Sequence, residues 1–307
     1  MGDRSILMDF LLASIATSGA CVVSNPMEVV KTRMQLQGEL AHNVTHSAAP
    51  VVQYRNFAHA FYTICRTEGI YGIQRGLGPG ISYQIFMNGP RLGLFEPLQK
   101  VFGATDPTSY WFPVRNVCAA ATSGMVGACA GSPFFLVKAR IQAASSAGKI
   151  NAQYAYNGMI DGFRQIIQAE GLKGLYRGAT ASIPRVAIGS GTQLATYTQA
   201  KNVVLAAGIE NGVKVHLGSS ILTGLVVTTA MNPIDVVSTR LYSQKVVKGK
   251  GKLYSGVLDC FSKTMKSEGL RGFYKGWSAH YMRLGPHTVF TFLFWEEAKK
   301  VASDLGY

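Results

Sequence analysis

The chain has 307 residues, of which 48% are hydrophobic and 15% are charged, and its formal net charge is +14 at pH 7. So few charged residues are unusual for a soluble domain, and the balance favours a membrane protein. A mean hydropathy of only +0.14 argues against uniformly apolar anchors. Helices that enclose a water-filled pathway carry one polar face and have this intermediate hydropathy.

One pattern occurs three times along the chain: a Pro-led motif, then a Glu-Gly pair, then a base-Gly pair. The prolines are Pro26, Pro133 and Pro233, the second elements begin at Glu68, Glu170 and Glu268, and the third begin at Arg75, Arg177 and Lys275. A tandem repeat of this length indicates one structural unit used three times. We therefore expect a single domain over 1–307, with repeats at approximately 5–105, 106–208 and 209–307.

Each repeat opens with a predicted long helix that holds its proline near the middle, over 5–37, 110–142 and 212–244. Proline removes one backbone hydrogen bond, so all three helices should kink. Pairs of small residues precede each proline in the same register: Ala13 and Thr17, Ala120 and Gly124, Ser220 and Gly224. This spacing lets helices approach closely in lipid.

A polar loop and a shorter amphipathic stretch follow each long helix, over 54–67, 157–169 and 255–267, and a second span follows over 77–101, 179–205 and 277–301. The amphipathic stretches suit a membrane surface, and the second spans are long enough to cross a bilayer. The predicted fold is an all-α membrane protein. It has six transmembrane helices in three pseudo-symmetric repeats and three short amphipathic helices.

Basic residues are concentrated in the three long connections, whereas the short connections near 102–110 and 205–212 contain none. This asymmetry predicts that the long loops face the negative side of the membrane and that both termini face the other side. A nucleic-acid-binding protein would place its basic residues among aromatic ones on a soluble fold, so no nucleic-acid partner is expected.

The sequence predicts no metal site, no cofactor and no enzymatic activity. The five cysteines lack metal-binding spacing, and His42 and His46 lie in a Ser/Ala-rich loop without further ligands. We find no nucleophile–base constellation. The residues Met1 to Arg4 include an acid and lead directly into the first predicted span, so no cleavable presequence is expected.

The threefold pattern of a Pro-led motif, a Glu-Gly pair and a base-Gly pair resembles the Pro-x-acid-x-x-base, Glu-Gly and aromatic-base-Gly signature of the mitochondrial carrier family, solute carrier family 25. Residues 8–11, 25–39 and 283–288 are similar to its oxaloacetate-carrier-like branch. The resemblance implies a monomeric, multi-pass carrier of small anionic metabolites in the mitochondrial inner membrane. It also implies short helices on the matrix side, termini in the intermembrane space, and inner-membrane lipids, including cardiolipin, as partners at the matrix-side helix ends.

The resemblance implies a matrix gate in which Glu28 pairs with Lys138 and Lys31 with Asp235. The third link is missing, because Phe135 and Ser238 occupy the acidic and basic positions. Losing both members avoids a stranded charge. Two glutamines one helical turn beyond the basic position, Gln35 and Gln142, are expected to brace the surviving bridges.

The family's intermembrane-space gate is expected at Glu96, Lys201, Glu296 and Lys299. Charge matching favours the pairs Glu96 with Lys299 and Glu296 with Lys201, leaving Gln99 and Thr198 as a neutral pair. The alternative is that these residues are ordinary helix-end charges that face solvent.

The family's substrate-contact positions fall seven residues after Gly76, Gly178 and Gly276. By resemblance, the substrate-binding residues are Tyr83, Gln84, Arg185, Val186 and Arg283, with Asn88, Arg91 and His287 as further contacts. Independently of any family, an arginine deep inside a span must face a wet cavity or a partner. Two converging guanidiniums suit a small dianion. His287 either carries a co-transported proton or is a packed neutral histidine.

The sequence therefore predicts a transporter of small dicarboxylates and inorganic dianions by alternating access. The candidate substrates are oxaloacetate, malate, malonate-like acids and sulfate. Antiport and proton symport are both open. Two alternatives remain: a proton-leak carrier of the uncoupler type, and a degenerate carrier that no longer transports and acts as a membrane scaffold.

Overall fold

The computed structural model describes residues 6–37, 39, 54–106, 109–144, 156–177, 179–208, 213–244, 246–247 and 250–304. His42, His46 and residues 1–4, which carried predictions about metal binding and targeting, lie outside these ranges. Nearly all of the described chain is helical, which confirms the predicted all-α class. The exception is a small hairpin of two-residue strands between the first and second helices of the third repeat.

The helices follow the predicted order in each repeat. The first repeat contains α1 (Ile6–Leu36), α2 (Phe57–Ile73), α3 (Leu77–Gly93) and α4 (Phe95–Val101). The second contains α5 (Phe112–Ala143), α6 (Met159–Glu170), α7 (Leu172–Leu175) and α8 (Ala179–Ala206). The third contains α9 (Val213–Ser243), β1 (Val246–Val247), β2 (Lys250–Gly251), α10 (Val257–Phe273) and α11 (Trp277–Asp304). Two short helices extend six residues beyond the expected ends, because α2 and α10 continue through kinks at Gly69 and Gly269.

The repeated glycines mark the turns that reverse the chain. The Glu-Gly glycines Gly69, Gly171 and Gly269 have φ angles of 67°, 71° and 64°. Gly76 and Gly276 of the base-Gly pairs have φ angles of 74° and 72°. Glycine adopts this left-handed conformation without the steric penalty of a Cβ atom. The repeated glycines thus allow the sharp backbone turns before and after the short segment that joins each Glu-Gly pair to its base-Gly pair.

One predicted span is broken. The sequence predicts a single helix over 77–101, whereas α3 ends at Gly93 and α4 begins at Phe95. The amides of Leu94 and Leu98 keep their helical bonds, to the carbonyls of Pro90 and Leu94. Pro97 has no N–H to donate to the Gly93 carbonyl, so the ladder is interrupted at this turn.

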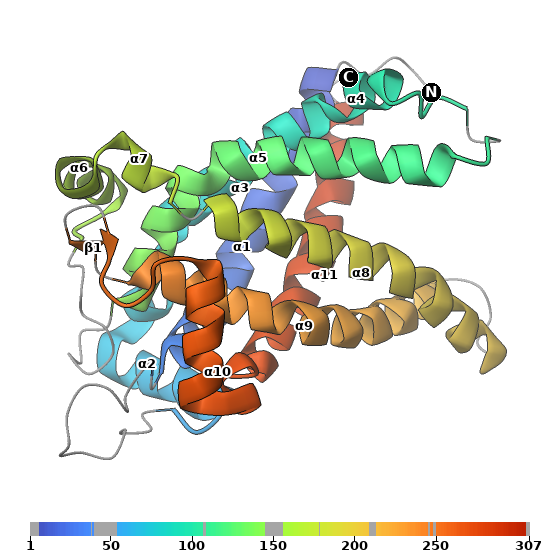
Figure 1. Cartoon of the computed structure of the whole chain (residues 1–307). Helices are drawn as coiled ribbons and strands as arrows, with labels where there is room; N and C mark the ends of the chain where they lie inside the picture. Colours follow the sequence, from blue (N-terminus) through green and yellow to red (C-terminus); the bar gives the residue numbers. More distant parts are fainter. Residues whose placement is uncertain are drawn as a thin grey trace.

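The six long elements form a closed ring. Packing across repeats is most extensive between α3 and α5, between α8 and α9, and between α11 and α1. The last helix therefore closes the ring on the first. Figure 1 shows the short helices α2, α6 and α10 at one end of the bundle, here called the short-helix end. The start of α1 and the end of α11 lie at the opposite end (Figure 1).

Small residues allow the two long helices of one repeat to approach each other. A Cβ atom added at Gly124 of α5 would lie 3.4 Å from Val186 of α8. The equivalent Gly224 of α9 is next to Tyr281 of α11. In the first repeat, the hydroxyl of Thr17 accepts a 3.2 Å hydrogen bond from the Asn88 amide. The small-residue register of the sequence thus faces the partner helix in all three repeats.

Buried apolar side chains form three clusters at the short-helix end. They centre on Val30 and Ile64, on Leu136 and Ile166, and on Val237 and Phe273. The outer faces of the long helices instead expose large apolar residues, including Ile15 (60%), Val117 (47%) and Leu293 (55%). By length and apolar composition alone, Val114–Ala143 and Gly218–Ser243 qualify as membrane spans. Exposed apolar surface over a ring of helices fits contact with lipid.

Replacing a turn glycine should destabilise the fold. Gly269→Ala places a side chain at φ 64°, which should cost about 1–2 kcal/mol of unfolding free energy. Thermal unfolding of the protein in detergent, followed by tryptophan fluorescence, measures the change. Gly78→Ala is the matched control, because an added Cβ atom meets nothing within 4 Å inside α3. An unchanged unfolding temperature for Gly269→Ala would contradict the backbone assignment.

Candidate functional site

A buried arginine fastens each kinked helix to its short helix. Arg33 donates hydrogen bonds of 2.6 and 2.9 Å to the Glu68 carboxylate. The equivalent ion pairs are Arg140 with Glu170 at 2.6 Å and Arg240 with Glu268 at 2.9 Å. The base of each base-Gly pair lies near the same carboxylate: Arg75 at 3.7 Å, Arg177 at 3.8 Å and Lys275 at 2.6 Å. These three Arg–Glu–base groups anchor the short-helix end.

The sequence analysis assigned no role to Arg33, Arg140 and Arg240. A signal was present, since each arginine follows its repeat's proline by seven residues. Residues seven apart lie on the same face of a helix. A buried ion pair with one partner removed leaves an uncompensated charge, so this repeated arginine belongs with the Glu-Gly motif as one structural unit.

The Glu268 carboxylate shows how this arrangement favours the charged form. Burial alone would raise the pKa of Glu268. Hydrogen bonds and charge from Arg240, followed by those from Lys275, outweigh burial and hold this pKa below its ordinary value of 4.5. The anchor is therefore a stable ion pair at neutral pH.

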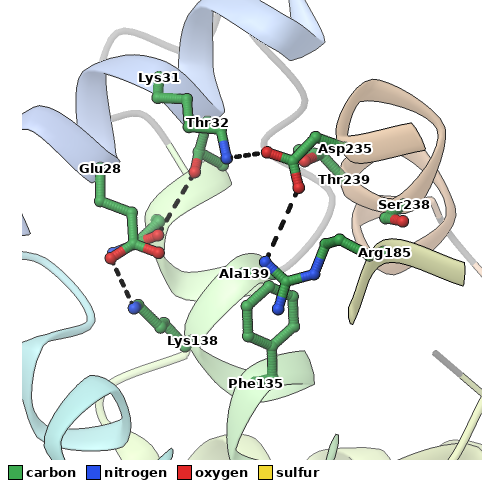
Figure 2. Close-up of a pocket in the computed structure, with 11 residues that line it drawn as sticks. Glu28, Lys31, Thr32, Phe135, Lys138, Ala139, Arg185, Asp235, Ser238 and Thr239 are labelled. Carbon is green, nitrogen blue, oxygen red and sulfur yellow. Dashed lines mark hydrogen bonds and ion pairs between the residues drawn. The ribbon is translucent and has the colours of Figure 1, made fainter. Parts of the chain in front are cut away.

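Two further ion pairs cross between repeats, deeper in the bundle. Lys138 of α5 donates a 2.7 Å hydrogen bond to Glu28 of α1. Lys31 of α1 pairs with Asp235 of α9. Figure 2 shows both pairs around one pocket. All four side chains are at most 10% exposed. Both pairings expected from the sequence are present at the short-helix side of the central site.

An aromatic cluster occupies the place of the missing third link. The ring of Phe135 lies 5.0 Å from that of Tyr83 and 4.9 Å from that of Tyr242. The guanidinium of Arg185 lies over the Phe135 ring at 5.0 Å, within the range of a cation–π contact. The third interface is thus closed by aromatic packing in place of an acid–base pair.

The two glutamines act differently from the prediction. Gln142 donates to Asn25 (3.1 Å) and accepts from Thr32 (3.4 Å). Gln35 accepts a 2.8 Å bond from Thr239. In the described part of the chain neither glutamine bonds to a lysine or carboxylate of the two ion pairs, so direct bracing is incorrect. The glutamines cross-link neighbouring helices beside the pairs, where short Thr and Asn side chains on the facing helix lie within their reach.

Each central arginine lies next to a carboxylate from another helix. The Nη1 atom of Arg185 is 3.7 Å from Asp235, and its Nη2 atom donates a 3.1 Å hydrogen bond to the Tyr83 hydroxyl. The Nε atom of Arg283 is 3.7 Å from Glu28. Their side chains are 13% and 18% exposed. Each carboxylate therefore lies within hydrogen-bonding distance of a lysine and slightly farther from an arginine.

This group of side chains has an excess of positive charge. Four cations, Lys31, Lys138, Arg185 and Arg283, surround two acids, Glu28 and Asp235, so the sum is 4 − 2 = +2. All of these side chains except Arg283 line one pocket, together with Thr32, Phe135 and Ser238. Buried charge is costly unless it is compensated, and within this group the two acids compensate two of the four cations.

The remaining predicted contacts lie on two sides of this layer. His287 accepts from the Gln84 amide at 3.4 Å and contacts the Ser24 hydroxyl at 3.1 Å. Val186 lies at the Gly124 contact between α5 and α8. Arg91 is exposed in the last turn of α3. Whether these residues touch a substrate stays a prediction.

The expected gate at the opposite end is unpaired in this structure. Among the described side chains, no ion pair joins Glu96, Lys201, Glu296 and Lys299. Gln99 donates to Asn116 at 2.7 Å, and Lys299 lies over the Trp295 ring at 4.8 Å. The side chain of Thr198 lies outside the described set. The predicted pairs would have to form in a different conformation.

The family pattern described as "Mitochondrial carrier protein" matches residues 2–106, 111–207 and 211–305. The chain therefore belongs to the mitochondrial carrier family, which consists of transporters. It is 43% identical to "Solute carrier family 25 member 35" of Mus musculus, over 95% of this chain and 97% of the relative. It is 40% identical to the "Mitochondrial oxaloacetate transport protein" of Saccharomyces cerevisiae, over 96% and 90%. It is 41% identical to "Mitochondrial citrate transporter E" of Aspergillus niger, over 96% and 94%.

The Glu268 anchor predicts a pH-dependent stability. Because the folded-state pKa of Glu268 is lowered below 4.5, its contribution is present above that value and is lost as the pH falls through the folded pKa. Glu268→Gln should lower the unfolding free energy at neutral pH by about 1.5–3 kcal/mol. The difference from wild type should shrink in acid. Thermal unfolding across this pH range measures it.

Glu297→Gln is the control for that experiment, because Glu297 forms an exposed i,i+3 pair with Lys300 and such pairs contribute little. A difference between wild type and Glu268→Gln that stays constant into acid would show that the Glu268 charge does not support the fold.

Proposed function

We propose that the protein carries small dicarboxylate or inorganic dianions across the mitochondrial inner membrane, one dianion in exchange for another. Oxaloacetate, malate, malonate-like acids and sulfate belong to this class. The observation that supports it most directly is the excess of two positive charges around Glu28 and Asp235. A dianion would neutralise this excess, whereas a monoanion would leave half of it and a neutral metabolite all of it.

Binding would use the two guanidiniums of Arg185 and Arg283. Each can hold a carboxylate or sulfate edge through two charge-assisted hydrogen bonds. A close contact of opposite unit charges is worth about 4 kcal/mol at an effective dielectric constant of 20, before desolvation is subtracted. The Tyr83 hydroxyl accepts a hydrogen bond from Arg185, so its own O–H is available to a keto or hydroxyl oxygen. The Gln84 amide contacts His287, which lies one turn beyond Arg283, and its N–H groups can meet such an oxygen as well.

The same contacts would couple binding to opening. Arg185 and Arg283 lie near the acids of the two closed ion pairs, so a bound dianion competes with Asp235 and Glu28 for the guanidiniums. The energy gained at the substrate offsets the weakening of the closed layer. The gate residues at the other end would then pair as the short-helix end opens, which is alternating access around one central site in a monomer.

Six membrane spans are proposed for the long elements α1, α3 with α4, α5, α8, α9 and α11. Apolar side chains on their outer faces support contact with lipid. The basic long loops favour the matrix for the short-helix end and the intermembrane space for both termini. We expect inner-membrane lipids, cardiolipin among them, at the matrix-side helix ends.

The names of two relatives agree with a carboxylate substrate, since one is an oxaloacetate transport protein and another a citrate transporter. The retained arginines and ion pairs disfavour a scaffold that no longer transports, because such a protein has no need of a buried excess charge. A proton leak without a specific dianion would also leave that excess unexplained. Neither the layer nor its surroundings suggest an enzymatic reaction.

The proposed function is tested with purified protein in liposomes. Labelled sulfate, oxaloacetate and malate are offered outside, with or without a dicarboxylate inside. Saturable uptake stimulated by an internal dianion is expected. Folded protein that conducts protons but moves none of these anions would favour the leak, and folded protein that does neither would favour the scaffold.

Removing either central arginine should impair transport while the protein remains folded. Arg185→Ala and Arg283→Ala should each reduce dianion uptake by about 10- to 100-fold, because a hydrogen bond to a charged group is worth roughly 1.5–3 kcal/mol. Initial uptake rates and thermal unfolding of each variant provide the test. Arg164→Ala on the exposed face of α6 is the matched control. Normal uptake by both central variants would place the substrate elsewhere.

A further inference from the structure

A buried histidine contacts the charged layer. His280 lies on α11 one turn before Arg283 and is 1% exposed. Its Nε2 atom is 3.3 Å from the Asp235 carboxylate. Its Nδ1 atom is 3.2 Å from the Oδ1 atom of Asn232. The sequence analysis did not assign a function to this residue.

The hydrogen bonds of Asn232 fix the direction of its amide. Its Nδ2 atom donates to the carbonyl of Phe273 at 2.6 Å and lies 3.5 Å from that of Lys275. The Oδ1 atom is therefore the one that faces His280. Both imidazole nitrogens consequently face acceptor oxygens. A neutral histidine has one N–H and can satisfy only one of them, whereas a protonated histidine satisfies both.

Three cations and one acid surround the His280 ring. Lys31 on α1, Arg185 on α8 and Arg283 on α11 are cations near the ring, and Asp235 on α9 is the adjacent acid. A dianion on the two arginines would cancel most of this positive potential. The unfilled hydrogen bond would then be completed by a proton from solution.

The equivalent positions of the other repeats cannot titrate in this way. Four residues after the base-Gly glycine, the first repeat has Gly80 and the second has Ser182, whose hydroxyl contacts that of Tyr242. His287 differs too, because the Gln84 amide nitrogen donates to its Nε2 atom and the Ser24 hydroxyl can accept from its Nδ1 atom. His287 is satisfied as a neutral ring. Of these positions, His280 is the one at which a ring nitrogen of the neutral histidine faces an acceptor oxygen without a proton to donate.

We propose that His280 binds one proton when the dianion binds, so that the proton and the dianion cross the membrane together. The proton comes from the solution on the side that delivers the substrate, occupies the second imidazole nitrogen between Asp235 and Asn232, and leaves on the other side. No covalent bond is formed or broken besides this N–H. The inference rests on the proposed transport of dianions. It adds to one-for-one exchange a net uptake in which a proton accompanies the dianion and no dianion has to leave.

The experiment uses the full chain in liposomes, with sulfate as the probe because it remains a dianion near neutral pH. Sulfate–sulfate exchange is measured without a gradient. Net sulfate accumulation is then measured with an acidic exterior and an alkaline lumen, with and without an ionophore that removes the pH gradient. We compare wild type, His280→Asn, His287→Asn and His59→Gln, the last being an exposed histidine on α2.

Wild type and His59→Gln should accumulate sulfate several-fold under the gradient, and the ionophore should abolish this accumulation. His287→Asn changes a predicted substrate contact, so its accumulation is compared with its own exchange rate, and the gradient should still drive it. His280→Asn should show reduced but measurable exchange and no gradient-driven accumulation. Gradient-driven accumulation by His280→Asn would overturn the proposal, and its loss in His287→Asn alone would move the proton to that residue. Exchange by wild type without any effect of the gradient would overturn the proposal and leave the proposed function standing. If wild type exchanges no dianion at all, the proposed function itself fails.

A second measurement decides the case in which His280→Asn exchanges too slowly to follow. The heat of sulfate binding in detergent, compared in two buffers with different ionisation enthalpies, gives the protons taken up per sulfate. About one proton is expected for wild type, and about none for His280→Asn or His280→Ser. Zero protons for wild type, or one for either variant, would overturn the proposal.

Discussion

Glu28 and Asp235 each lie between a lysine on a kinked helix and an arginine on a second helix of a repeat. Neither acid can satisfy both cations fully, because the lysines are at hydrogen-bonding distance and the arginines are at 3.7 Å. These shared contacts constrain the positions of the helices that carry the six charged side chains, which are α1, α5, α8, α9 and α11. The kinked helices must bring the lysines across repeats, and α8 and α11 must place a guanidinium over the same carboxylates.

Under the proposed function, the layer is both a closure and a binding site, and the two share the same atoms. In a protein where gate and site are separate, a signal has to travel between them through packed side chains. Here, an anion that draws a guanidinium away from its acid changes the gate directly. The aromatic third interface around Phe135 carries no acid of its own, so the change is concentrated at two of the three interfaces. This division makes the three repeats unequal in role although they are similar in fold.

Much of this architecture follows from local sequence. The prolines, the positive-φ glycines and the amphipathic segments determine helix order and bounds because each acts through its own backbone. The break at Leu94 does not follow from the length and hydropathy of residues 77–101, because it depends on Pro97 leaving the Gly93 carbonyl without its helical donor. The partners of Gln35, Gln142 and His280 depend on the rotation of one helix against another. Residue spacing along a single helix does not contain that rotation, which only the assembled ring determines.

The closure of the ring by α11 against α1 has a topological consequence. The α3–α5 and α8–α9 interfaces are each bridged by the chain itself, whereas the equally extensive α11–α1 interface is a seam without a covalent connection. Packing, the Ser24–His287 contact and the Arg283–Glu28 ion pair hold this seam together. Chain ends that meet in space tolerate being joined while the chain is opened elsewhere. A circular permutant that begins at the second repeat would keep every helix contact and move the seam to α3–α5. The three interfaces are thus interchangeable in connectivity, and differ only in the side chains that line them.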